Sequence, residues 1–127
     1  MTPVTPLHDI GQIAVHASDI ARATAYYRDA LGLPFLFDAP GLAFFQAGTV
    51  RLMLSGPETP EFDHASSVLY FNVTDIASAH RTLAGRGVRF RDQPHVVHRT
   101  PQGALWMSFF DDSEGNVHAI MEWKAAG

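Results

Sequence analysis

Hydrophobic and polar positions repeat along the chain in two similar blocks. Each block opens with a strand-like run that ends in a Ser/Thr-Asp-Ile step, at residues 12–20 in the first block and 68–76 in the second. Apolar residues at helical spacing follow each step. Asp19 and Asp75, or the Ser/Thr before each of them, are suitable helix N-caps. The pattern therefore predicts two copies of one strand–helix unit.

Further strand-like runs follow each predicted helix. They cover residues 43–47 and 50–55 in the first block, and residues 104–110 and 117–122 in the second. Gly- and Asn-containing turns separate the members of each pair, as in β-hairpins. The proline-containing stretch 91–103 is expected to form a long loop.

These elements predict a single domain of class α+β, built from two modules. The first module covers about residues 8–56 and the second about residues 67–123, with a Pro- and Glu-containing linker at about 57–66 between them. A length of 127 residues and a hydrophobic content of 46% are sufficient for one core.

Alternation along the predicted strands indicates two different sheet faces. In the first strand, Ile13 and Val15 share an apolar face that is expected to pack on a helix, whereas Gln12 and His16 share a mixed face. Polar groups among apolar neighbours are typical of a ligand pocket. A solvent-exposed sheet face has the same pattern, so both interpretations remain open.

Composition excludes several functions and partners. The formal net charge of −4 argues against nucleic acid and against an anionic membrane, because both attract basic surfaces. The absence of cysteine excludes disulfides and thiolate metal sites. No apolar run reaches the ~18 residues of a membrane span, and the first residues do not form a signal-peptide pattern. A cytoplasmic protein is expected.

The repeat, the pair Tyr26-Tyr27, the run 31–33 (Leu-Gly-Leu) and the turn 112–116 (Asp-Ser-Glu-Gly-Asn) together resemble the vicinal oxygen chelate superfamily. This group includes glyoxalase I, methylmalonyl-CoA epimerase, extradiol dioxygenases and bleomycin-binding proteins. The resemblance covers nearly the whole chain and implies two βαβββ modules whose curved mixed sheets form a half-barrel with flanking helices. It also implies a homodimer, in which the partner would cover exposed strand edges.

In metal-dependent members of that superfamily, four inward side chains hold one divalent cation. The resemblance carries these positions onto Gln12, Met53, Val68 and Ala119. Only Gln12 offers an oxygen ligand, and one amide oxygen does not hold a divalent ion firmly. We therefore expect no metal and no other cofactor, with a divalent metal as the alternative.

Candidate site residues come from the mixed strand faces and from the loop 91–103. A small organic ligand is expected to contact Gln12, Phe45, Arg51, Met53, Val68, Tyr70, Trp106 and Ala119. His95 and His16 are the candidate general acids or bases, since imidazole titrates near neutral pH. The spacing from His95 to His98 also suits a metal site, but no third ligand accompanies the pair.

Two functions follow from these residues, and the sequence leaves open whether the protein is an enzyme. The first is metal-independent binding of a small molecule, as in bleomycin-resistance proteins. The alternative is a lyase, isomerase or dioxygenase of the glyoxalase or epimerase type, with His95 or His16 as the base. An accessory subunit with a closed cavity is a third possibility.

Overall fold

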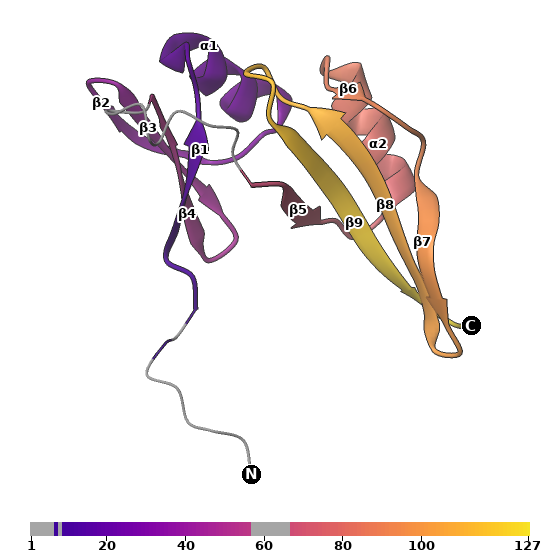
Figure 1. Ribbon diagram of the computed structural model, residues 1–127. Coiled ribbons are helices and arrows are strands. Elements are labelled where there is room, and N and C mark those ends of the chain that lie inside the picture. Colours follow the sequence, from indigo (N-terminus) through magenta and orange to yellow (C-terminus); the bar gives the residue numbers. More distant parts are fainter. Residues whose placement is uncertain (1–6, 8, 57–66) are drawn as a thin grey trace.

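The two sequence blocks form two sheets, each accompanied by a helix (Figure 1). The structure, a computed structural model, describes residues 7, 9–56 and 67–127. The predicted linker at 57–66 therefore lies outside the described residues. The sheets are open and do not close into a barrel. The predicted α+β class is confirmed.

The first module contains four strands and one helix, whose second part is π-helical. Its sheet has the order β1-β4-β3-β2, with β1 parallel to β4 and the other pairs antiparallel. The elements are β1 (Gln12–His16), α1 (Ile20–Ala25), the π-helical turn η1 (Tyr26–Ala30), β2 (Phe35–Ala39), β3 (Leu42–Ala47) and β4 (Val50–Ser55).

The second module repeats this arrangement with one strand divided. The sheet order is β5-β9-β8-β6, and β7 also pairs with β8. Because β9 occupies one edge of β8, β6 and β7 share the other edge and together take the place of β2. The elements are β5 (Leu69–Asn72), α2 (Ile76–Gly85), β6 (Arg89–Phe90), β7 (His95–Thr100), β8 (Gly103–Asp111) and β9 (Val117–Ala125).

The prediction of a long loop at 91–103 was wrong for its central part, which forms β7. Pro94 and Pro101 indicated a loop, but both lie just outside the strand. The residues between them include Val96, Val97 and Thr100, which favour extended backbone. An edge strand can follow directly on a proline because its outer N–H groups need no partner.

Both helices begin at the aspartates that the repeat indicated. The Asp19 carboxylate accepts a hydrogen bond from the Arg22 N–H at 3.0 Å, and the Asp75 carboxylate accepts one from the Ser78 N–H at 3.2 Å. These bonds satisfy N–H groups that have no partner inside the helix. The structure thus selects the aspartates over the preceding Ser18 and Thr74 as caps.

The core consists of two apolar clusters on the helix-facing sides of the sheets. The first surrounds Tyr27, Phe45 and Leu52, and the second surrounds Phe110 and Ile120. Tyr26 and Leu31 of the first module, together with Phe71 of the second, pack against both clusters, so the modules share one continuous interior. In the described part of the chain, no helix is long and apolar enough to cross a membrane.

Candidate functional site

Strand register divides each sheet into a helix-facing side and a side that we call its open face. In the first sheet, Gln12 pairs with Arg51 and Ala14 pairs with Met53. The side chains of these four residues point to the side of the sheet opposite to that of the buried Leu52. The first open face therefore carries Gln12, His16, Phe44, Gln46, Arg51, Met53 and Ser55. The second open face carries Tyr70, Asn72, Met107, Phe109, Ala119 and Met121, by the register of β5, β8 and β9.

Three predicted site residues contact one another on the first open face. The Arg51 Nε donates a hydrogen bond to the Gln12 Oε1 at 2.7 Å, and the Gln12 Nε2 lies 3.7 Å from the Met53 Sδ. The Arg51 guanidinium carbon also lies 5.1 Å from the centre of the Phe44 ring, and Phe44 stacks on Phe37 at 4.4 Å between ring centres. The face thus combines a cation, an amide, a thioether and two rings.

Two other predicted residues meet on the second open face. Ala119 pairs with Tyr70 on one side and with Phe109 on the other, and the centres of those two rings are 6.1 Å apart. Ala119 is fully buried, whereas Tyr70 is 49% exposed. A ligand on this face would therefore contact the rings and not the Ala119 methyl group.

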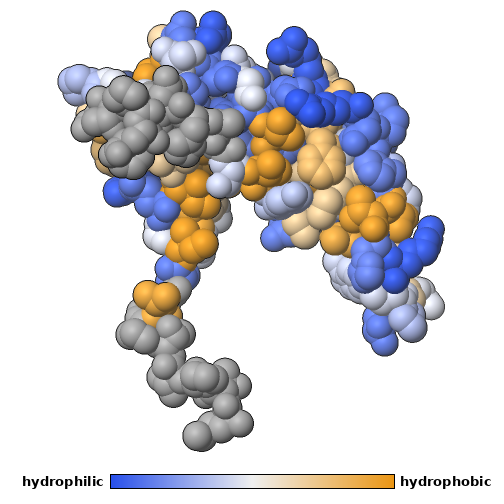
Figure 2. Space-filling view, viewed as in Figure 1, coloured by the Kyte–Doolittle hydropathy of each residue, from blue (hydrophilic) through white to orange (hydrophobic). Residues whose placement is uncertain are grey.

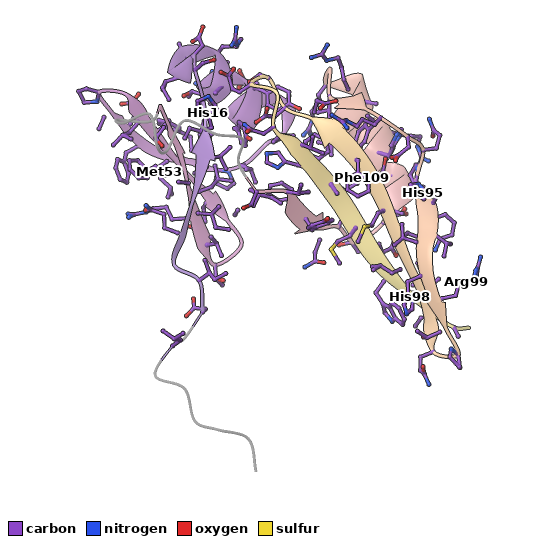
Figure 3. The ribbon with its side chains drawn as sticks, in the orientation of Figure 1. His16, Met53, His95, His98, Arg99 and Phe109 are labelled. Carbon is purple, nitrogen blue, oxygen red and sulfur yellow. The ribbon has the colours of Figure 1, made fainter. Side chains whose placement is uncertain are left out.

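A hollow of about 320 Å³ separates the two sheets. Figure 2 shows apolar side chains on both sides of the gap between the modules. Val68, just before β5, and Tyr70 in β5 line one side of the hollow, and Ile13 and Leu52 line it from the first sheet. Ile13 and Leu52 belong to the helix-facing side, so the first open face is turned away from this hollow. The predicted site residues on the open faces therefore form two groups on separate sheets. Figure 3 shows Met53 on the first sheet and Phe109, which is a neighbour of Tyr70 and was not predicted, on the second.

The candidate histidines are also distributed over both sheets (Figure 3). His95 pairs with Met107, and its Nδ1 lies 2.8 Å from the Gln93 carbonyl oxygen. A carbonyl only accepts, so Nδ1 carries the proton and Nε2 is left as the acceptor of the neutral ring. His98 pairs with Leu105 further along the same strand. His16 ends β1, half-buried, at the opposite module.

Phe45 and Trp106 differ from the expectation that they line a ligand site. Phe45 is fully buried against Tyr27 at a ring distance of 6.0 Å. Trp106 packs against the cluster of Phe110 and Ile120, with the Lys124 ammonium 4.6 Å from its ring centre. The pleat places both on helix-facing sides and leaves the neighbouring Phe44 on the open face.

The residues at the carried-over metal positions do not fit a divalent cation. Met53 offers a thioether, Val68 and Ala119 offer no donor atom, and the Gln12 oxygen already accepts from Arg51. In a chain without cysteine, oxygen and imidazole are the donors that hold hard and borderline divalent ions. Among the residues at 7, 9–56 and 67–127, no group of three or more His, Asp or Glu side chains could hold a metal ion.

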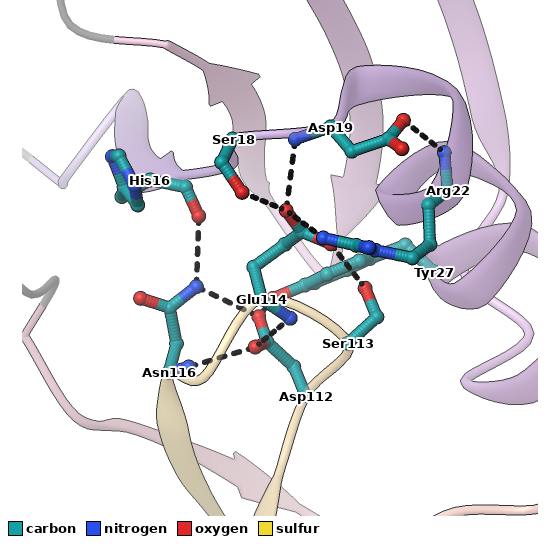
Figure 4. A network of polar contacts seen from close by, with 9 residues as sticks. All are labelled: His16, Ser18, Asp19, Arg22, Tyr27, Asp112, Ser113, Glu114 and Asn116. Atoms are coloured by element: carbon teal, nitrogen blue, oxygen red, sulfur yellow. Dashed lines mark hydrogen bonds and ion pairs between the residues drawn. The ribbon is translucent and has the colours of Figure 1, made fainter.

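Sequence reasoning missed a buried polar network that joins the modules (Figure 4). The Tyr27 hydroxyl donates to the Asp112 carboxylate at 2.6 Å and lies 2.9 Å from the His118 Nε2. Since the tyrosine proton goes to the carboxylate, the His118 Nε2–H donates to the Tyr27 oxygen. The His118 Nδ1 then faces the Leu69 N–H at 3.4 Å. One polar chain thus crosses from η1 through β9 to β5.

The turn between β8 and β9 continues this network. The Asp112 carboxylate accepts from the backbone N–H groups of Glu114 and Asn116, each at 2.8 Å. The Glu114 carboxylate accepts from the Asp19 N–H at 2.9 Å and from the Arg22 Nε at 2.8 Å. The Asn116 amide donates to the His16 carbonyl at 2.8 Å, while the His16 ring points away (Figure 4). The turn was visible in the sequence as part of the family resemblance, without a structural role.

The electrostatics of the network follow from burial and hydrogen bonding. Burial opposes ionisation of Asp112, but the nearby His118 ring and the hydrogen bonds from Tyr27 and Asn116 outweigh it and lower the pKa to about 2. Burial likewise opposes ionisation of Glu114, and Arg22, Asp19 and Ser18 lower its pKa to about 2. Burial, with the Asp112 carboxylate, raises the pKa of Tyr27. Tyr27, Asp112 and His118 have almost no exposed surface, which indicates a structural role.

Comparison with known proteins agrees with this fold. The model of the Glyoxalase/Bleomycin resistance protein/Dioxygenase superfamily matches residues 9–121. A glyoxylase-like domain-containing protein of Didymella fabae is 28% identical over 126 residues, covering 87% of this chain and 91% of that protein.

Two solved structures illustrate the range of proteins with this fold. TnmS3, an antibiotic binding protein from Streptomyces sp. CB03234, has a TM-score of 0.76 at 23% identity, covering 95% of this chain and 100% of that chain. A lactoylglutathione lyase from Agrobacterium tumefaciens has a TM-score of 0.68 at 22% identity, covering 93% and 96%. At such identities the likeness extends to the fold alone.

Proposed function

Because this chain belongs to the Glyoxalase/Bleomycin resistance protein/Dioxygenase superfamily, we propose that it is a cytoplasmic protein that binds a small, partly aromatic organic molecule without a metal ion. The observation that carries this proposal is the composition of the two open faces. One presents Gln12, Arg51 and Met53 in mutual contact, and the other presents Tyr70 and Phe109 as adjacent rings. Apolar surface with a few fixed polar groups is the usual composition of a binding site.

Two copies of the chain would enclose the ligand better than one. In the described residues, the first open face does not line the hollow that Tyr70 lines, and β1 and β5 each end a sheet with an unpaired edge. In a homodimer, the first open face of one copy could lie against the second open face of the other. Each face would then be covered by the partner. This assembly predicts that native mass spectrometry finds a dimer at micromolar concentration, and a monomer there would contradict it.

The similarity to TnmS3 supports ligand binding, since that protein is described as an antibiotic binding protein. The alternative is that the protein is an enzyme. The similarity to a lactoylglutathione lyase supports this alternative. The His95 Nε2 is the available base in that case, because its Nδ1–H is engaged by Gln93. Catalysis would then rely on His95 together with groups from the opposite face.

A binding screen distinguishes the two functions. We expect a small aromatic compound to raise the melting temperature and to bind in calorimetry, because a ligand of the native state stabilises it by mass action. Tyr70→Ala and Met53→Ala should each weaken binding about tenfold through lost apolar contact. Arg28→Ala, on the exposed side of η1, is the matched control and should bind normally.

Turnover would overturn the proposal. Purified protein should leave the hemithioacetal of methylglyoxal and glutathione unchanged, with or without added Ni²⁺ or Zn²⁺. Conversion of that compound at a rate that falls in His95→Asn would establish the enzymatic alternative. Stoichiometric metal in protein purified without chelator would contradict metal-independent binding.

A further inference from the structure

Arg51 is held in one orientation by two neutral neighbours. Its Nε donates to the Gln12 oxygen at 2.7 Å, and its guanidinium group lies over the Phe44 ring at 5.1 Å from the ring centre. Arg51 itself is exposed. A guanidinium group bonded through Nε still has four N–H donors on its two terminal nitrogens. Arg51 therefore presents a pre-oriented pair of donors at the surface of the first open face.

The contacts that the structure describes around Arg51 are with neutral groups. Three arginines of the described residues form ion pairs with carboxylates, Arg22 with Glu114, Arg28 with Asp29 and Arg91 with Asp111, and the others do not. Within the described part of the chain, the ion pairs do not include Arg51. The Gln12 amide orients the guanidinium group without cancelling its charge. The first open face thus carries a fixed positive charge in a protein of net charge −4.

Apolar surface lies directly beside this charge. Phe37 stacks on Phe44 at 4.4 Å and is 47% exposed. The Met53 thioether lies next to Gln12, and Met53 is the cross-strand partner of Phe44. An arginine fork matches the two oxygens of a carboxylate, and a flat ring next to that carboxylate would cover Phe37 or Met53.

We infer that the ligand of the first open face is a planar organic anion, with its carboxylate bound by the terminal nitrogens of Arg51 and its ring resting on the adjacent apolar side chains. This inference rests on the proposed function and specifies the class of ligand. The negative net charge of the protein repels anions at long range. Selection for an anion must therefore come from the local contact with Arg51.

A matched pair of probes tests the inference. The 2-naphthoate anion and its neutral isostere 2-naphthamide have the same ring and nearly the same shape. By calorimetry, 2-naphthoate should bind the wild-type protein about tenfold more tightly, as expected for a charge-assisted bidentate contact. Arg51→Gln should remove this preference, and Arg51→Lys should retain part of it because it keeps the charge and loses the fork. Arg28→Gln is the control and should keep the full preference.

The outcomes separate this inference from the proposed function. Equal binding of the two probes, or a preference that survives Arg51→Gln, would overturn the anion assignment and leave small-molecule binding intact. Binding of other neutral compounds but of neither probe would have the same meaning. If no compound of either charge binds, the proposed function fails and the inference fails with it. Circular dichroism of Arg51→Gln should match the wild type, since this side chain is exposed.

Discussion

The two modules have the same backbone plan and different interiors. Leu52 pairs with Ile13 in the first sheet, and His118 pairs with Leu69 at the equivalent position of the second. Leu52 and His118 are both buried on the helix-facing side. The first module thus fills this position with an apolar side chain, whereas the second fills it with an imidazole that bonds to Tyr27 of the first module.

The turns that precede Leu52 and His118 also differ, both in length and in the polar contacts that they make. A two-residue turn, Gly48-Thr49, joins β3 to β4, whereas the five residues 112–116 join β8 to β9. The longer turn supplies Asp112 and Glu114, which bind η1 and the start of α1. The comparison teaches that the first module fills the Leu52 position with an apolar contact, whereas the second uses the equivalent His118 position for a polar link between the modules. The polar residues that hold the two modules together lie on the β8–β9 hairpin in the second module and on the helix, with Ser18 before it, in the first.

Among the changes that test the polar link between the modules, removal of the Asp112 side chain should lower the stability of the protein most. Asp112→Ala deprives Tyr27, Asn116 and two backbone N–H groups of their acceptor, all of them at or near buried positions. The free energy of unfolding should fall by about 4 kcal/mol, because buried donors are left without partners. Urea titration would measure the loss. Asp29→Ala, which breaks an exposed ion pair, should change it only slightly. A loss of that small size in Asp112→Ala would contradict the role of the network.

Acidification should lower the free energy of unfolding by a somewhat smaller amount, because it protonates Asp112 and Glu114 in the polar network between the modules. The pKa values of Asp112 and Glu114 are both lowered to about 2 in the folded protein, so the unfolded chain binds protons more readily. Their stabilising contribution is complete above about pH 5, where both states are ionised, and is lost as the pH falls through about 4 toward 2. We expect a loss of about 3 kcal/mol, measured by urea titrations from pH 7 to pH 3 and below.

A flat stability profile between pH 5 and pH 3 would rule out this linkage. Glu114→Gln provides the internal check, since it removes one of the two titrating groups. Its own stability will be lower, but the decrease with falling pH should be shallower than in the wild type.

A double-mutant cycle gives the smallest and most specific effect. Tyr27→Phe and His118→Leu together should cost about 1 kcal/mol less than the sum of the single changes, because they remove two partners of one hydrogen bond. Tyr26→Phe is the matched control, since its hydroxyl bonds to the Asp111 carbonyl and not to His118. That variant combined with His118→Leu should be additive to within about 0.5 kcal/mol. Additivity in the first cycle would show that the modules are not coupled through this bond.

Features with local signals could be predicted from the sequence, and features that depend on docking could not. The caps at Asp19 and Asp75 were visible because a cap bonds to an N–H three residues away. Two adjacent aromatic residues, by contrast, gave the wrong face: Phe45 was predicted to contact a ligand, but the structure places Phe45 on the helix-facing side and Phe44 on the open face.

The candidate site shows the same division. The contact of Gln12 with Arg51 and Met53 follows from strand alternation, once β1 and β4 are known to be neighbours. The separation of these residues from Tyr70 could not be deduced, because it depends on how the two sheets are placed. No pattern within one block indicates that Tyr27 meets His118, since the partners lie 91 positions apart in the chain.

The position of Asp112 has a consequence for the order of folding. Its carboxylate bonds to Asn116 four residues away and to Tyr27 85 residues away. Contacts between near neighbours close early and cheaply, whereas distant ones require most of the chain to be brought together first. The β8–β9 hairpin can therefore present a shaped acceptor before the amino-terminal half arrives. The Tyr27–Asp112 hydrogen bond then forms only if the helix of the first module docks in its native position, since a misplaced helix would leave that carboxylate without its distant donor.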